Sequence, residues 1–208
     1  NLIFDFMSYF NFSKYLVPIH THSYLYQNNR KQIIYNKNIL SINKTNQIKF
    51  ESFFKNFLTE NNIQNYKSLI TYANRDQAYK KYLDNNKNWT YHDFRNFSPD
   101  VFISTIENFC NKNYLNCRVG NVSEQKLIVN NSLFVDYSKS KSVSEQLDIY
   151  LIFKSKFFVG SGSGLDKIAS FFKIPILYVN SFNLSYLPHY IHKCIYVPNI
   201  YYDLKTNK

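Results

Sequence analysis

The stretch KFFVGSGSGLDKIASFFKIPILYVN, residues 156–180, contains three of the four glycine residues in this 208-residue chain. Its first part, KFFVG, is a compact apolar run that predicts a buried strand, and SGLDKIASFF has the apolar spacing of a helix. PILYVN predicts a second strand. Gly160, Gly162 and Gly164 therefore fall in a strand-to-helix turn, and a strand–helix–strand unit indicates parallel strands.

The same alternation of strands and helices continues on both sides of this stretch. Helices are expected at 49–61, at 76–83, from the Ser98-Pro99 pair onward and after the capping-box pair Ser142 and Glu145, and strands at 68–73, 114–121, 132–138 and 193–198. The sequence thus predicts an α/β fold. A Rossmann-like parallel sheet flanked by helices would occupy residues 63–208, and residues 1–62 would form an irregular N-terminal segment.

The length and composition suffice for one packed core and allow one or two domains. Hydrophobic residues make up 45% of the chain, aromatic residues 19% and charged residues 19%, which excludes a disordered protein. No run of about 18 uncharged apolar residues predicts a membrane span. Cys110, Cys117 and Cys194 lack metal-ligand spacing and are expected to be free thiols in a reducing compartment, which favours a cytoplasmic location.

The formal charge of +11 comes from 25 Lys and Arg residues against 14 Asp and Glu residues. Such an excess attracts nucleic acid, anionic lipid or a phosphorylated ligand. Asn, Lys, Ile, Phe and Tyr are all abundant, and a bias toward A/T-rich codons would explain the lysines equally well. The basic residues are dispersed along the sequence. We therefore expect no nucleic-acid partner, and favour a phosphate ligand or contact with an anionic membrane surface.

Ligands of parallel sheets bind outside the carboxyl ends of the strands, so the residues at those ends are the candidates for a site. Arg75 and Asp76 follow the strand expected at 68–73. An arginine there can make two hydrogen bonds to a phosphate or carboxylate. An ion pair between Arg75 and Asp76, or a helix cap by Asp76, would explain the two residues equally well.

The turn at 160–164 offers a second candidate. Glycine permits positive φ and close approach of a ligand to the main chain, and the helix that follows has unpaired N–H groups at its start. Ser161 and Ser163 add hydroxyl groups, so the turn is typical of a phosphate-binding cradle. Its spacing matches neither GxGxxG nor the GxxxxGK[ST] loop. The alternative is a tight turn in which glycine serves packing alone.

Weaker candidates lie near the other strand ends. Arg118 and Gly120 close one strand, and Asp136 closes the next. Asp148 lies in an apolar helix ahead of the glycine turn, where it could orient that turn or simply cap a neighbour. The loop YHDFR contains His92 and Asp93, either of which could act as a general base. HExxH, paired Cys/His and GxSxG patterns are absent, so we expect no metal, no zinc chemistry and no serine hydrolase.

Several motifs together resemble a bacterial family of surface-polysaccharide glycosyltransferases. They are NRDQAYKKYL, NWTYHDFRN, the long segment FVDYSKSKSVSEQLDIYLIFKSKFFVGSGSGLDKIASFFKIPILYVN, and LSYLP, in the family's order over about residues 49–188. The arrangement is more distantly similar to fucosyltransferase-type enzymes with a GT-B-like nucleotide domain. The resemblance implies that residues 63–208 are the nucleotide-sugar half of such an enzyme, and residues 1–62 the remnant of its acceptor-side domain.

Carried over residue by residue, the resemblance assigns Arg75 to the nucleotide diphosphate and the turn Ser161, Gly162, Ser163 and Gly164 to its phosphates. Asp148 corresponds to the family's helix aspartate, and the CRVG strand end places Arg118 and Gly120 near the nucleotide, with Asp136 beside them. His92, Asp93 and Asp76 are the expected catalytic groups. The chain departs from the family at Ala73, where members often have a histidine two residues before the arginine.

The expected function is then metal-independent transfer of a sugar from a nucleotide-diphosphate donor, with GDP favoured and no cofactor. The acceptor would be a glycan or a lipid-linked glycan in surface-polysaccharide synthesis, handled in the cytoplasm or at the periphery of the inner membrane. The alternative is a truncated or non-catalytic domain that binds a nucleotide or an anionic glycan. Ala73 favours this alternative, and the glycine turn with Arg75 favours the enzyme.

Overall fold

A computed structural model describes residues 10–12, 40–141, 143–181 and 193–198. Its centre is a six-stranded sheet in which every neighbouring pair of strands is parallel, in the order β5-β4-β3-β6-β7-β8. The strands are β3 (Leu69–Tyr72), β4 (Leu115–Arg118), β5 (Phe134–Asp136), β6 (Ser155–Gly160), β7 (Ile176–Ser181) and β8 (Cys194–Pro198). The predicted α/β class with a Rossmann-like parallel sheet is confirmed.

The order of the strands reverses direction between β3 and β6. From β3 the chain moves outward to β4 and β5, then returns to β6 and moves outward on the other side to β7 and β8. This is the strand order of doubly wound dinucleotide-binding folds, in which the loops after the two central strands diverge to opposite faces of the sheet. In such folds the divergence opens a crevice at the carboxyl ends of the two central strands, which are β3 and β6 in this chain.

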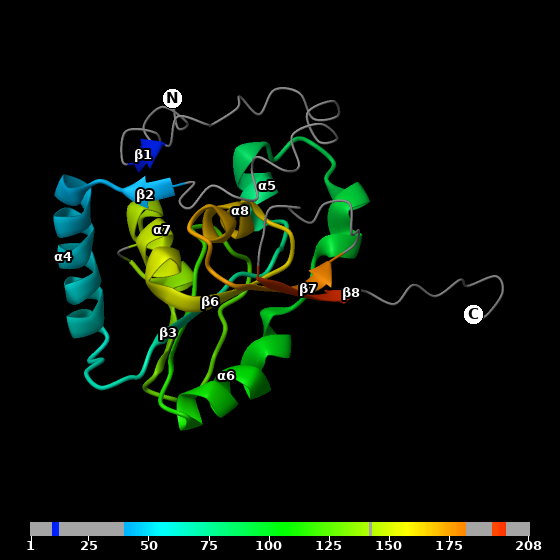
Figure 1. Ribbon diagram of the computed structural model, residues 1–208. Helices are drawn as coiled ribbons and strands as arrows, with labels where there is room; N and C mark the ends of the chain where they lie inside the picture. The colour runs from blue at the N-terminus through cyan, green and yellow to red at the C-terminus, as the bar shows by residue number, and fades with distance from the viewer. Residues whose placement is uncertain (1–9, 13–39, 142, 182–192, 199–208) are drawn as a thin grey trace.

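Three helices cover one face of the sheet: α4 (Lys44–Glu60), α7 (Glu145–Lys154) and α8 (Gly164–Phe171). α4 lies outermost, beside α7 (Figure 1). Its buried aromatic side chains Phe50 and Phe54 contact Tyr150 of α7, with ring centroids 5.7 and 6.1 Å apart. Although α4 falls within the predicted segment 1–62, it contributes to the same hydrophobic core as the sheet.

A short 3₁₀ turn, η2 (Pro99–Phe102), and α6 (Ile103–Asn111) cover the opposite face over β3 and β4. Side chains of β3 alternate between the two faces, because successive residues of a strand point to opposite sides. Ile70 and Tyr72 pack with Phe102 and Ile106 under α6, whereas Leu69 packs under α7. The predicted Ser98 cap is confirmed, since its side chain accepts the N–H of Asp100.

The remaining described elements connect or border this core. They are β1 (Phe10–Phe12), paired antiparallel with β2 (Leu40–Ile42), then α5 (Ala78–Leu83), η1 (Thr90–Arg95) and η3 (Tyr137–Lys139). The predicted strand at 193–198 is confirmed as β8. Most of the expected segment 1–62 before residue 40 lies outside the described residues.

Two local predictions are wrong. The capping residue of α7 is Ser144, which accepts the N–H of Leu147 at 3.2 Å, and not Ser142, because the helix begins at Glu145. The helix expected from Ser98-Pro99 onward begins instead as a 3₁₀ turn, in which Val101 is 61% exposed. The tighter winding of this turn, η2, with three residues per turn moves Val101 off the buried stripe of α6.

Candidate functional site

The candidate site lies at the carboxyl edge of the sheet, where β3 and β6 are neighbours. The N–H of Ala73 donates to the carbonyl of Val159 at 2.9 Å, so the two strands are still paired where they end. The loop that begins with Asn74 and Arg75 and the glycine turn at 161–164 therefore start side by side. The structure thus brings the two strongest sequence candidates to neighbouring strand ends, the place where the general rule for doubly wound sheets puts a ligand crevice.

The glycine turn wraps around a carboxylate of the protein itself, that of Asp166. The N–H of Ser163 donates to its Oδ2 at 2.5 Å, and the hydroxyl of Ser163 lies 3.2 Å from its Oδ1, as part of a capping box. The side chain of Asp166 is buried, and burial raises its pKa to about 6 against the lowering effect of these hydrogen bonds. Ser163, predicted to hold phosphate, is thus engaged inside the turn.

The three glycines of the turn differ in their backbone conformation and in what a Cβ at each position would meet. A Cβ at Gly160 would lie 2.9 Å from Cγ of Asp166 and 2.5 Å from a ring carbon of Phe158, so only glycine lets the carboxylate approach. Gly162 has φ +80°, a left-handed conformation that other residues rarely adopt. Among the described residues, no atom lies within 4 Å of a Cβ placed at Gly164. The main chain is therefore open to a ligand at Gly164.

The turn also carries donors for which the described part of the chain supplies no acceptor. Gly164 and Leu165 occupy the first two positions of α8, where N–H groups have no acceptor within the helix. The hydroxyl of Ser161 is buried, and in the part of the chain that the structure describes it has no hydrogen-bond partner. These three donors lie at the positive end of the α8 dipole, which favours an anion beside them.

On the other side of the crevice, Arg75 is half-buried and its carbonyl accepts the N–H of Phe97 at 3.3 Å. Asp76 is fully occupied by the main chain, since its two oxygens accept the N–H groups of Ala78 at 3.0 Å and Glu124 at 2.9 Å. Asp76 therefore ties the start of α5 to the loop after β4. This geometry describes a positioning carboxylate better than a catalytic one.

The YHDFR segment, η1, lies against this loop. Asp93 is exposed and accepts hydrogen bonds from the side chains of Gln77 and Asn96. The motifs NRDQ and YHDFRN, which the sequence separates by more than ten residues, are thus brought together at the end of β3. The backbone of His92 forms part of η1, and its side chain lies outside the description.

Arg118 and Asp136 form a buried ion pair. Nη1 of Arg118 lies 3.2 Å from Oδ2 of Asp136, and the side chains are 1% and 4% exposed. Arg118 also donates to the side chain of Asn74 at 2.9 Å and to the carbonyl of Gln125 at 2.7 Å. Both residues were expected to contact the nucleotide. The structure instead uses them to hold the loops after β3, β4 and β5 together beneath the site.

Asp148 supports the loop after β4 from below. Its Oδ1 accepts the N–H of Gly120 at 3.0 Å, and burial raises its pKa to about 7. Gly120 has φ +121°, and its Cβ position lies 3.7 Å from Cδ1 of Leu165 at the start of α8. The loop after β4 therefore lies near the start of α8, and Asp148 binds this loop and not the glycine turn that it was expected to orient.

Ala73 is 2% exposed and belongs to the core cluster on the α7 face. The position at which the resembling family often carries a histidine is therefore inside the protein in this chain. A hollow of about 230 Å³ does open beside Arg75's loop. It is lined by the residues Asn74, Asp76, Asn96, Phe97, Ser98, Pro99, Glu124 and Gln125.

Asp166 is the main site residue that the sequence reading missed. The pattern Ser163-x-x-Asp166 at the start of a helical run is a capping-box signal, and it would have identified the carboxylate as the partner of the turn. Asn74, which holds Arg118, carries no comparable signal because its partner is 44 residues away.

Within the described ranges, no group of three or more His, Cys, Asp or Glu side chains is placed to hold a metal ion. In the same ranges, no helix has the length and apolar character needed to cross a membrane. Comparisons with family models, curated proteins and solved structures find no match to this chain. The interpretation of the site therefore depends on its own geometry.

Proposed function

We propose that this chain binds a nucleotide-diphosphate sugar in the crevice between β3 and β6 and transfers the sugar to an acceptor hydroxyl. The observation that carries the proposal is the position of Arg75 and of the α8 N-terminus on the two sides of the strand-order reversal. Doubly wound sheets bind nucleotides at this place. The proposal of a sugar nucleotide as the ligand is supported by the resemblance of the NRDQ, YHDFRN and GSGSG motifs to those of glycosyltransferases.

The chemistry asked of the site is stabilisation of a leaving group. As the bond between the sugar and the diphosphate breaks, negative charge develops on the diphosphate oxygens. Arg75 and the N–H groups of Gly164 and Leu165 would compensate this charge with donors fixed in advance, which is an effective form of catalysis. No metal ion is needed for this step.

The second requirement is a base that takes the proton from the acceptor hydroxyl while its oxygen bonds to the sugar carbon. Asp93 is better suited than Asp76, because it is exposed and accepts only side-chain hydrogen bonds. Asp76 has both oxygens committed to backbone N–H groups. We assign Asp93 as the base and keep His92 as the neighbouring candidate within the same segment.

A second candidate function, binding without transfer, is favoured by two observations. Asp166 fills part of the cradle that the glycine turn would otherwise offer to phosphate. Ala73 provides no catalytic group where the resembling family often has histidine. A domain with these features could hold a nucleotide or an anionic glycan and leave the chemistry to another protein.

A thermal-shift series with GDP, UDP and CMP, free and as sugar conjugates, tests the proposal. A ligand that binds the folded state raises Tm by an amount that grows with its concentration, and about 100 Kd of ligand contributes about 2.7 kcal/mol. A shift with a sugar nucleotide and hydrolysis or transfer of its sugar would support the enzyme. A shift without turnover would support the binding domain. No shift with any nucleotide would reject the enzyme and nucleotide binding, and would favour the anionic glycan as the ligand of a binding domain.

A further inference from the structure

The amino edge of the sheet, opposite the candidate site, gathers lysines that are scattered in the sequence. Five of the six strands have a lysine within the three residues before their first residue, and because all six strands are parallel, these lysines lie along one edge. We define the basic edge by these residues: Lys67, Lys112, Lys154, Lys156, Lys173 and Lys193. The described segments that lead into the strands, 61–68, 112–114, 131–133, 172–175 and 193, contain no Asp or Glu.

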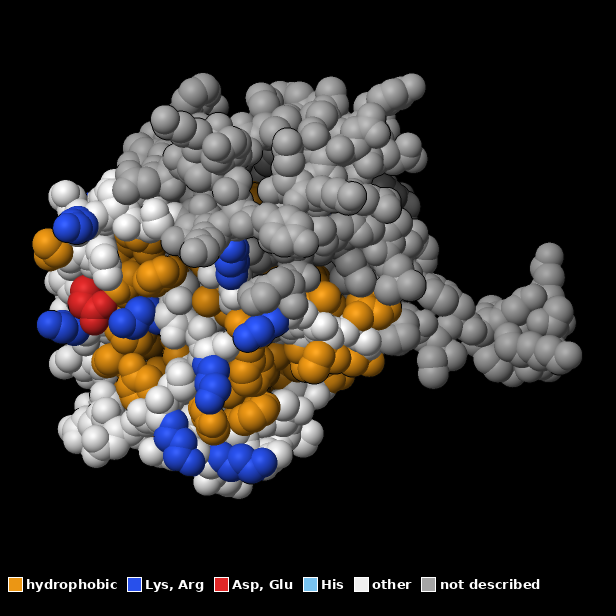
Figure 2. All heavy atoms as spheres, in the orientation of Figure 1, with side chains coloured by type: hydrophobic (Ala, Val, Ile, Leu, Met, Phe, Trp, Pro, Cys, Tyr) orange, Lys and Arg blue, Asp and Glu red, His pale blue; other side chains and the backbone are white. Residues whose placement is uncertain are grey.

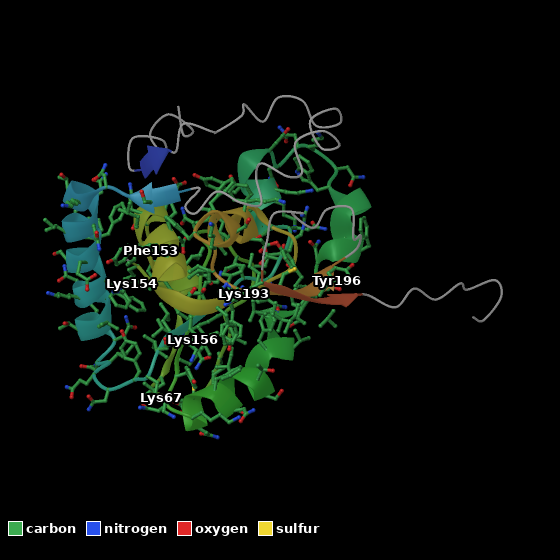
Figure 3. The ribbon with its side chains drawn as sticks, in the orientation of Figure 1. Lys67, Phe153, Lys154, Lys156, Lys193 and Tyr196 are labelled. Atoms are coloured by element: carbon green, nitrogen blue, oxygen red, sulfur yellow. The ribbon has the colours of Figure 1, made fainter. Side chains whose placement is uncertain are left out.

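Backbone hydrogen bonds confirm that the basic edge is continuous. The N–H of Lys67 donates to the carbonyl of Asn113, and the N–H of Ile176 donates to the carbonyl of Lys193. In Figure 3, Lys67, Lys156 and Lys193 follow one another from the bottom of the view toward β8. Figure 2 shows the same face, where lysine side chains lie among hydrophobic ones and acidic side chains gather at one place at the left.

Acidic residues on the bordering helices leave this charge largely intact. Glu51 of α4 is already paired with Lys154 and Tyr150. Glu107 of α6 lies two residues from both Thr105 and Phe109, which is about 200° around the helix and therefore on the side away from the sheet. Glu60 ends α4 at the outer margin. The basic edge thus carries a strong local excess of positive charge.

Apolar surface lies directly beside the basic edge. A groove of about 810 Å³ runs between α6 and the strands β7 and β8, and Lys193 stands at its margin. In β8, Ile195 is 68% and Val197 is 48% exposed, and the two-residue period of a strand puts them on the same face as Lys193. None of the described elements covers these side chains.

We propose that the basic edge and the adjoining apolar strip of β8 dock this protein on the surface of an anionic phospholipid membrane. Lysines attract anionic headgroups, and exposed aliphatic side chains beside them can enter the boundary between headgroups and acyl chains. Because the candidate site lies at the other edge of the sheet, docking leaves its crevice open to solution, about 20 Å of strand away for the six residues of β6.

A nucleic-acid partner fits the same surface less well. Single-stranded nucleic acid is bound by aromatic faces on which bases stack. Tyr114, the aromatic residue in the middle of the basic edge, is already covered by Lys67 and Lys156, whose Nζ atoms lie 5.8 and 5.4 Å from its ring centroid. The aliphatic strip formed by Ile195 and Val197 offers nothing to a phosphate backbone.

Vesicle flotation of the full chain tests this proposal without any nucleotide, so its outcome is separate from that of the proposed function. We expect binding to phosphatidylcholine vesicles that contain phosphatidylglycerol, little binding to pure phosphatidylcholine, and weaker binding at high salt. The triple variant Lys112→Glu, Lys156→Glu, Lys193→Glu should lower the partition coefficient at least a hundredfold, since each lysine near such a surface contributes about fivefold.

The matched control is Lys87→Glu, Lys126→Glu, Lys141→Glu, which makes the same change in net charge at exposed positions outside the basic edge. It should keep most of the binding. Ile195→Gln should lower vesicle binding and leave binding to a single-stranded RNA unchanged. Equal losses in the two triple variants, absence of binding to anionic vesicles, or tighter binding to RNA than to vesicles would each overturn the proposal.

Discussion

The N–H of Gly120 donates to Oδ1 of Asp148 at 3.0 Å, so a carboxylate beneath the sheet holds the loop that ends β4. Asp148 is 3% exposed, and Gly120 in turn contacts the start of α8 through Leu165. The loop after β4 is thus held by a single buried acid and lies near the start of α8, which follows the glycine turn. Stability of the site should depend on the charge of that acid.

Replacement of Asp148 by Asn should stabilise the protein at alkaline pH. Burial raises the folded-state pKa of Asp148 to about 7, above its ordinary value of 3.8, so the folded state holds the proton more tightly than the unfolded state does. The stability from this group is complete below about pH 4 and is lost as the pH rises through 7. Asn keeps the acceptor for Gly120 without a charge to bury.

Urea unfolding at pH 4, 6 and 8 measures this difference. The Asp148→Asn variant should exceed the wild type at pH 8 by as much as about 4 kcal/mol, since one pKa unit corresponds to about 1.4 kcal/mol, and the gap should shrink toward pH 4. The control is Asp84→Asn at an exposed position. It should leave the free energy of unfolding unchanged at all three pH values. Parallel pH profiles for the wild type and Asp148→Asn would contradict the prediction.

Gly160 and Gly164 should respond in opposite ways to alanine. In Gly160→Ala the new methyl group would collide with Asp166 and Phe158, and overpacking of this kind costs about 1–3 kcal/mol. In Gly164→Ala the methyl group meets no atom of the described residues, and the protein gains about 0.4–1 kcal/mol of stability because the unfolded chain has fewer conformations to lose. Urea midpoints of the two variants give the comparison.

The nucleotide affinities of Gly160→Ala and Gly164→Ala provide a second comparison between these two variants. If phosphate oxygens approach the main chain at Gly164, Gly164→Ala should weaken nucleotide binding although the fold is more stable. Unchanged affinity in that variant would place the ligand elsewhere in the crevice. Gly160→Ala, which acts through Asp166, should lower both stability and affinity.

The fold could be predicted from the sequence because it depends on local patterns. Each of these patterns involves residues that are close together in the sequence. Examples are the apolar run of β6, the Ser98-Pro99 helix start, and the helical spacing of Phe50, Phe54 and Phe57. The roles of Arg118 and Asp136 could not be predicted, because burial depends on partners such as Asn74 that are distant in the sequence. A strand-end arginine looks the same whether it faces a ligand or a buried carboxylate.

Arg118→Leu should therefore unfold the protein more readily and should not act as a binding mutation. Removal of one member of a buried ion pair leaves the other charge without a partner, and this costs about 3–5 kcal/mol. Asp136 would be that charge, 4% exposed beneath the loops. Guanidinium unfolding measures the loss. An Arg118→Leu variant with wild-type stability and no nucleotide binding would contradict this prediction and indicate that Arg118 contacts the nucleotide.

Arg75→Ala should give the reverse result. Its side chain is half-buried at the mouth of the crevice, and loss of a charged hydrogen bond to a diphosphate costs about 1.5–3 kcal/mol, which lowers affinity by roughly ten- to a hundredfold. Calorimetric titration with the best nucleotide from the thermal-shift series measures the change, with Arg75→Lys as the variant that keeps the charge. Full transfer activity in Arg75→Ala would remove it from the mechanism.

Ala73→His tests whether this chain has lost a catalytic histidine or never used one at that position. Ala73 is buried in the core on the α7 face, and its N–H pairs β3 with β6. A histidine there would overpack the core at a cost of about 1–3 kcal/mol, and we expect neither higher nucleotide affinity nor faster transfer. Ala73→Ser, a smaller polar change, should fold nearly as well as the wild type. A stable Ala73→His protein with increased transfer would show that the crevice can admit this side chain, and would make the wild type an impaired member of the family it resembles.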